Sequence, residues 1–254
     1  MIFLKIGLSF GICMLIVANW KENKDVSELD AWVSDFSADR KLIEDLRVCP
    51  DKVEVVVSPS LPLIYPLKMV LKEHDLGDVI GVASQDISAQ LKGSHTGETG
   101  AFQLSSLVKY CIIGHSERRS MGETPLEVNQ KIDSALKAGI IPIVCFSSED
   151  ELKQIEPEIV GDIMLAYEPV GSIGAGKPAS IKDLKKVHFE WGLNKFIYGG
   201  SIDKKNINDY LKQDFIGGFL VGTASLDAAG FSLLVRKAVD YAWKSYLNLR
   251  NRTV

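Results

Sequence analysis

Cysteine is scarce in this sequence, with four residues in 254. They stand far apart, without a C-x-x-C pair or a nearby pair of histidines, at Cys13, Cys49, Cys111 and Cys145. This spacing argues against a disulfide framework and against the usual zinc sites. We therefore expect reduced thiols, a cytoplasmic location and no metal site.

The sequence also lacks a strong charge of one sign. It has 29 Lys and Arg residues against 33 Asp and Glu residues, a formal net charge of −4, and the basic residues are scattered. A nucleic-acid-binding domain usually concentrates positive charge on one face, so we expect no nucleic-acid partner. With 46% hydrophobic and 24% charged residues, the composition is typical of a globular protein with a large core.

One long apolar run occurs, "MIFLKIGLSFGICMLIVA" at residues 1–18, and it has the character of a signal sequence or a short membrane anchor. However, "LIVANWK" also has the pattern of a first strand. A strand that starts at Met14 leaves about a dozen apolar residues before it, too few to span a bilayer. We expect residues 1–13 to be an extension outside the fold, residues 14–254 to form one domain, and no membrane partner. A tethered form is the alternative.

Short apolar, β-branched runs alternate with helical patterns along the chain, and no low-complexity linker interrupts them. Near-continuous apolar runs are typical of parallel strands that are buried on both faces. Between them, Val128, Ile132 and Ala135 mark one face of a helix that should end at Gly139. Eight such strands predict an α/β fold, a single (β/α)8 barrel. The expected strands are 15–19, 53–58, 79–84, 110–114, 140–146, 163–167, 195–199 and 218–222.

Polar residues and glycines follow the predicted strands. In a barrel of this kind, the carboxyl ends of the strands surround the active site. These ends carry Asn19 and Lys21, Gln85, His115 and Glu117, Glu168, the turn 199–201, and the turn 222–223.

Each of the three ionisable candidates has a catalytic and a structural interpretation. Glu168, between a buried strand and a proline, is a candidate general base, or else a capping residue. His115 precedes "SERR", which can open a short helix. A helix N-terminus disfavours the imidazolium, so His115 is either a neutral hydrogen-bond donor or a core histidine. Lys21 is placed to attract an anion, or else is a solvated charge.

Glycine-rich turns follow the last two strands, "YGGSI" and "VGTAS". Barrels bind phosphate at this place through backbone N–H groups and a helix N-terminus, here expected near Ser225 or Asp227. A third glycine-rich stretch, "GSIGAGKP", is not a nucleotide loop, because Pro178 lacks the hydroxyl that such a loop places on Mg²⁺. Prolines at both ends favour a hinged lid over residues 169–178.

Taken together and in this order, "ANWKEN", "CIIGHSERRSMGE", "AYEPVGSIGAGKP", "YGGSI" and "GFLVGTASL" resemble the triosephosphate isomerase family over most of the chain, from about residue 15 to residue 247. The resemblance implies a TIM barrel and a glycolytic and gluconeogenic isomerase without metal or organic cofactor. The reaction interconverts dihydroxyacetone phosphate and glyceraldehyde 3-phosphate through an enediolate. Glu168 would be the base, His115 would polarise the carbonyl, and Lys21, with Asn19 nearby, would stabilise negative charge.

The same resemblance implies how the substrate and a second subunit are bound. Four backbone N–H groups would hold the phosphate, those of Gly174, Ser201, Gly222 and Thr223. Glu117 would support the lysine and the histidine. "SHTGETG" (94–100) is similar to the loop that reaches into a partner subunit, which implies a homodimer. Thr96 would support the partner's site, and Glu98 and Arg118 would pair across the interface.

The chain departs from the family at several positions. Gly171 and Ala175 stand where the lid usually has Trp and Thr, and Thr223 stands where a glycine is usual. The segments 145–168 and 177–198 are short, which predicts shortened helices 5 and 6. These departures motivate one alternative, a catalytically impaired relative with a binding or scaffolding role. A Schiff-base aldolase would need a lysine inside the barrel on a later strand, and none is predicted there.

Overall fold

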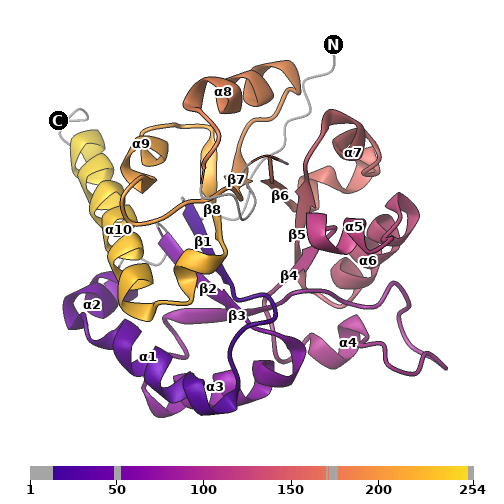
Figure 1. Cartoon of the computed structure of the whole chain (residues 1–254), viewed down its shortest axis with the longest axis horizontal. Coiled ribbons are helices and arrows are strands. Elements are labelled where there is room, and N and C mark those ends of the chain that lie inside the picture. The colour runs from indigo at the N-terminus through magenta and orange to yellow at the C-terminus, as the bar shows by residue number, and fades with distance from the viewer. Residues whose placement is uncertain (1–13, 49–52, 170, 172–176, 251–254) are drawn as a thin grey trace.

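The apolar runs form the eight strands of a closed parallel barrel, which is surrounded by helices (Figure 1). The computed structural model describes residues 14–48, 53–169, 171 and 177–250. Each strand pairs with the next along the chain, and β8 pairs with β1 to close the barrel. The strands are β1 (Met14–Asn19), β2 (Val53–Ser58), β3 (Ile80–Ser84), β4 (Tyr110–Ile113), β5 (Ile141–Phe146), β6 (Met164–Tyr167), β7 (Phe196–Tyr198) and β8 (Ile216–Val221).

Helices of very different lengths connect the strands. The predicted helix that should end at Gly139 is α6: Thr124 caps it together with Glu127, and Gly139 follows its last turn with φ of 74°. The α-helices are α1 (Leu29–Ser37), α2 (Arg40–Val48), α3 (Ile64–Glu73), α4 (Ala101–Leu104), α5 (Ser116–Ser120), α6 (Pro125–Lys137), α7 (Glu149–Lys153), α8 (Ile181–Glu190), α9 (Ile207–Leu211) and α10 (Ala228–Arg250). Short 3-10 helices are η1 (Val26–Glu28), η2 (Leu61–Leu63), η3 (Pro157–Asp162) and η4 (Thr223–Ser225).

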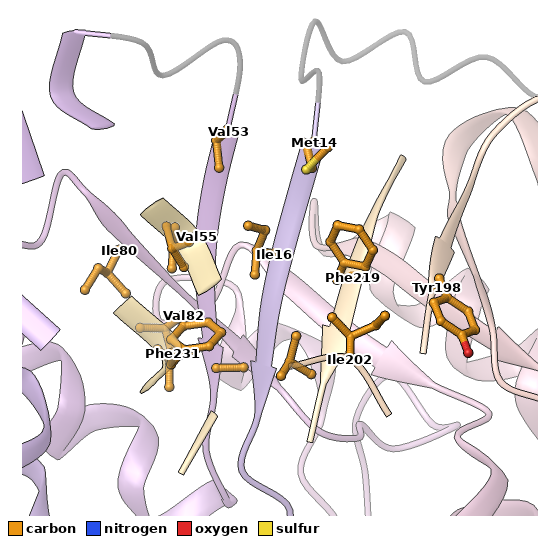
Figure 2. Close-up of a cluster of buried hydrophobic side chains, with 14 of the residues drawn as sticks. Met14, Ile16, Val53, Val55, Ile80, Val82, Tyr198, Ile202, Phe219 and Phe231 are labelled. Carbon is orange, nitrogen blue, oxygen red and sulfur yellow. The ribbon is translucent and has the colours of Figure 1, made fainter. Parts of the chain in front are cut away.

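The strands are buried on both faces and separate two apolar cores. In β1, Leu15 and Val17 face the inside of the barrel, whereas Met14 and Ile16 face the surrounding helices. Figure 2 shows the outer core, in which side chains of neighbouring strands lie beside Phe231 of α10. This two-sided burial explains why the strands read as continuous apolar runs.

The predicted barrel is confirmed, and its strands begin and end within two residues of the predicted limits. The largest difference is at β8, which begins at Ile216 instead of Gly218. The connection after β5 has only α7, with five residues, and the short η3, and the connection after β6 has the ten-residue α8. The segment after β5 therefore carries only short helices, whereas α8 in the segment after β6 is as long as α3.

The first 13 residues lie outside the described part of the chain, so the predicted extension stays a prediction. Among the helices that are described, none is both long enough and apolar enough to cross a membrane.

Candidate active site

A cavity of about 380 Å³ opens at the carboxyl ends of the strands. Residues from both ends of the chain line it, because closing the barrel brings β8 beside β1. Among the lining residues are most of the predicted site residues: Asn19, Lys21, His115, Glu168, Gly199, Ser201, Gly222 and Thr223.

Lys21 follows β1 in a left-handed backbone conformation, with φ of 53°. A residue with a side chain pays a conformational penalty there unless its surroundings hold it. Two contacts do so: the Lys21 N–H donates to Asn19 Oδ1 at 3.1 Å, and Gln85 Nε2 donates to the Lys21 carbonyl at 2.9 Å. The lysine is thus fixed at the rim by the ends of β1 and β3.

The ammonium group of Lys21 pairs with Glu117, with 2.5 Å between Nζ and Oε1. Glu117 is also linked to His115, since its N–H donates to His115 Nδ1 at 3.2 Å. One residue of α5 therefore contacts both the lysine and the histidine.

His115 caps the N-terminus of α5 and is buried. Because Nδ1 accepts a hydrogen bond from the backbone, the proton of the neutral ring is assigned to Nε2. That nitrogen lies 2.9 Å from Glu168 Oε1. The neutral imidazole is therefore a donor that faces the carboxylate.

Glu168 is buried, with 2% of its surface exposed, and three neighbouring groups hold it in place. Its N–H donates to the Phe146 carbonyl at 2.9 Å, and its Oε2 accepts from Ser116 N at 3.1 Å. Gly199 lies against its stem: a Cβ at position 199 would be 3.0 Å from Glu168 Cγ. A buried carboxylate beside a neutral histidine, at the edge of a cavity, is suited to accept a proton.

Cys145 lies in the inner core next to this pair. Burial, and secondly the charge of Glu168, raise the pKa of the Cys145 thiol well above its usual value. The thiol is therefore protonated at neutral pH, and this is its weakly nucleophilic form.

The turns after β7 and β8 also line the cavity. Ser201 has φ of 43°, and a Cβ at Gly222 would be 3.6 Å from Lys21 Cε. The helical turn after β8 is η4, which starts at Thr223, and α10 starts at Ala228. The helical N-terminus next to the glycines is therefore that of η4, at Thr223, and it lies closer to them than the helix N-terminus expected at Ser225 or Asp227.

The predicted lid falls largely outside the described residues, which include neither Gly174 nor Ala175. The described residue that follows the lid, Ala179, is held by two hydrogen bonds. The N–H of Ala179 donates to Tyr198 Oη and the Tyr210 hydroxyl donates to the Ala179 carbonyl, both at 2.7 Å.

The residues expected at an interface lie beside the site. Glu98 and Arg118 line a second cavity of about 350 Å³, which shares Lys21, Asn19 and His115 with the first. Thr96 lies two residues before Glu98 in the same loop and is exposed. Within the chain, Arg118 Nε is 3.1 Å from Asp86 Oδ2.

Sequence analysis missed a buried ionic cluster behind α5. Lys131, on the apolar face of α6, has a side chain 8% exposed and pairs with Asp86 and Glu123. Burial lowers the pKa of Lys131, but these two hydrogen-bonded carboxylates outweigh it and raise the pKa above its usual value. The helical spacing could have predicted this burial: Lys131 follows Val128 by three residues and therefore lies on the helix face that points to the core.

Comparison with known proteins agrees with the motifs. The family model for triosephosphate isomerase matches residues 14–238. Curated triosephosphate isomerases with 34% identity occur in Dehalococcoides mccartyi strain CBDB1, covering 89% of this chain and 96% of the relative, and in Colwellia psychrerythraea, covering 88% and 97%. The protein of that name from Thermus thermophilus is 33% identical over 89% of this chain and 98% of its own length. The match spans the barrel and every residue that lines the first cavity, and the chain belongs to the triosephosphate isomerase family.

Proposed function

We propose that the protein interconverts dihydroxyacetone phosphate and D-glyceraldehyde 3-phosphate, with Glu168, His115 and Lys21 as its catalytic residues. The observation that supports these roles best is the buried contact of 2.9 Å between Glu168 and His115, at a cavity that Lys21 also lines. Family membership supports the reaction.

This geometry suits a proton transfer in the following steps. Glu168 takes a proton from the carbon beside the substrate carbonyl, and negative charge develops on the carbonyl oxygen. His115 donates its Nε2 proton to that oxygen and moves protons between the two oxygens of the enediolate. Glu168 then returns its proton to the neighbouring carbon. The two side chains bond to each other, so a bound substrate must replace this hydrogen bond.

Lys21 and the glycine-rich turns stabilise the negative charges of the enediolate and the phosphate. The ammonium of Lys21 lies at the rim, where it offsets charge on the enediolate and on the phosphate. The N–H groups of Ser201, Gly222 and Thr223, together with that of Gly174, bind the phosphate. The reaction moves protons within one molecule, and as proposed it needs no metal or organic cofactor.

Replacing Lys21 by Met tests this function directly. We expect kcat/KM to fall by about 10²–10³-fold, because a preorganised charge at the site of developing negative charge is lost. A coupled assay with a dehydrogenase and purified protein measures it.

Lys24→Met is the matched control. Lys24 also has a positive φ, of 67°, but its ammonium lies over the Trp20 ring and outside the lining of the cavity. Equal activities of the two variants would contradict the role of Lys21. A folded wild-type protein without isomerase activity would overturn the proposed function itself.

We also propose a homodimer in which the loop around Thr96 of one subunit enters the second cavity of its partner. The connection between β3 and α4 extends away from the barrel (Figure 1). Around the second cavity, apolar side chains are exposed: Leu61 lines it and is 48% exposed, and Tyr65, one turn later, is 58% exposed. Glu98 and Arg118 would then pair between subunits, and Asp86 already orients the guanidinium.

Thr96→Arg should therefore shift the protein from dimer to monomer and lower kcat about tenfold or more, because a large charged side chain opposes insertion and the site loses its support. Light scattering coupled to size-exclusion chromatography measures the mass. Ser34→Arg on the exposed side of α1 adds the same charge as a control. A wild-type protein that is monomeric at micromolar concentration would refute the dimer.

We propose a cytoplasmic location, with residues 1–13 as an extension outside the barrel of residues 14–254. The free, buried thiols of Cys111 and Cys145 suit a reducing compartment. Cell fractionation with an antibody tests both points.

A further inference from the structure

The position of Glu168 depends on the end of β6, which is a strand of four residues. Side chains alternate along a strand, so Ala166 and Glu168 face the inside while Tyr167 faces the outside of the barrel. Ala166 accordingly belongs to the inner core, and the half-buried Tyr167 packs against the outer core. Whatever holds the Tyr167 ring therefore also limits the motion of the next residue, Glu168.

Three aromatic rings surround the Tyr167 ring. Phe146 lies 5.5 Å away between ring centroids, Trp191 lies 5.5 Å away edge-on, and Phe196 lies 6.0 Å away edge-on. Edge-on contacts at these distances are favourable beyond the apolar area that they bury. These four residues form an aromatic cluster on the outer side of the barrel, directly behind the general base.

Backbone hydrogen bonds tie the same cluster to Glu168. Phe146 contacts Tyr167 with its ring, and its carbonyl accepts the N–H of Glu168. On the other side, Gly199 N donates to the Tyr167 carbonyl at 2.9 Å. A displacement of the Tyr167 ring would thus be transmitted to the peptide that carries the base.

Trp191 differs from the other members because it does not come from a strand. It is the C-cap of α8 and lies 6.1 Å from the Phe146 ring. The connection after β5 offers only short helices, so the outer side of β5 and β6 is covered in part by this single ring from the following connection. No member of the cluster lines the cavity.

We infer that Trp191 is a positioning residue for Glu168: it holds the Tyr167 ring from outside the barrel and so keeps the carboxylate in place for proton transfer. The inference rests on the proposed function. The Glu168 side chain has little room to move, because the Gly199 backbone packs against it: a Cβ added at Gly199 would be 3.0 Å from Glu168 Cγ. A misplacement of about 1 Å in such a group can cost about 10²-fold in rate.

Three variants test the inference. Trp191→Leu removes the ring and keeps apolar volume, Trp191→Phe keeps a ring, and Trp243→Leu is the control. Trp243 is also partly buried and edge-on to a tyrosine, Tyr246, but it lies on α10. We expect Trp191→Leu to lower kcat about tenfold with KM changed less than about twofold, and Trp191→Phe to restore most of the loss.

A kinetic isotope effect separates positioning from stability. With substrate deuterated at the carbon that loses its proton, the primary isotope effect on kcat should rise in Trp191→Leu and stay at the wild-type value in Trp243→Leu. In addition, Trp191→Leu should change the residual activity of Glu168→Gln by less than about twofold, because the group that it positions is gone.

Two results would overturn the inference while leaving the proposed function intact. One is an active wild type in which Trp191→Leu and Trp243→Leu have the same kcat and isotope effect. The other is a tenfold loss that persists in the Glu168→Gln background. Should Trp191→Leu fail to fold, Trp191→Met, which also removes the ring but leaves a longer apolar side chain, takes its place: a raised isotope effect supports positioning, and an unchanged one opposes it. An inactive, folded wild type would instead refute the proposed function.

Discussion

Glu168→Gln should lower kcat by about 10³–10⁴-fold while the protein remains folded. The amide has nearly the same shape as the carboxylate, and its oxygen can still accept from Ser116 N. However, it does not accept a proton from carbon at neutral pH. Since the carboxylate is the group that bonds His115 at the cavity, its removal should affect the chemical step and have little effect on KM.

The coupled isomerase assay measures this loss, and circular dichroism checks the fold. Glu54→Gln is a suitable control: Glu54 is also a largely buried carboxylate of the barrel, but it bonds Tyr110 and Lys109 at the opposite end. We expect it to retain most of the activity. A Glu168→Gln variant with more than about a tenth of wild-type kcat would exclude Glu168 as the general base.

Gly218→Ala should lower the free energy of unfolding by about 3 kcal/mol or more. Gly218 in β8 lies opposite Leu15 in β1, where the barrel closes. A Cβ at this position would be 2.1 Å from the Leu15 carbonyl oxygen, a backbone atom that cannot move without separating the two strands. On its other side, β8 pairs with β7 through a register shift at the same place, since Phe196 pairs with Ile216 and Ile197 with Gly218.

Urea unfolding followed by tryptophan fluorescence measures the change, with Gly77→Ala as the control. Gly77 follows α3, and no atom lies within 4 Å of the position that its Cβ would take. The control should therefore stay within about 0.5 kcal/mol of wild type. If the two variants unfold at the same urea concentration, closure of the barrel does not depend on this contact.

The family explains why the motifs are recognisable, and the site geometry supports the chemistry proposed for them. The departures concern the lid and the short helices. Lys21, Glu117, His115 and Glu168 form a continuous set of contacts. These contacts support an active isomerase over an impaired relative, and α8 supplies Trp191 where the outer layer is thin.

The sequence by itself determined the kind of fold and the place of the candidate site. Continuous apolar runs are a local property, because each strand is buried on both faces wherever it lies in the barrel. The residues at the strand ends could likewise be named in advance, since all parallel strands end at the same side. This is why Lys21, His115 and Glu168 could be singled out before any contact between them was known.

Only the tertiary structure decided which of these groups touch. The bond between His115 and Glu168, the burial of Lys131 between two carboxylates, and the contact of Trp191 with Tyr167 each join separate segments. The requirement for glycine at position 218 depends on the closure of β8 onto β1, which brings it against the Leu15 carbonyl. Periodicity records which side of an element is buried, but not which partner buries it, because that choice is made by the packing of the whole chain.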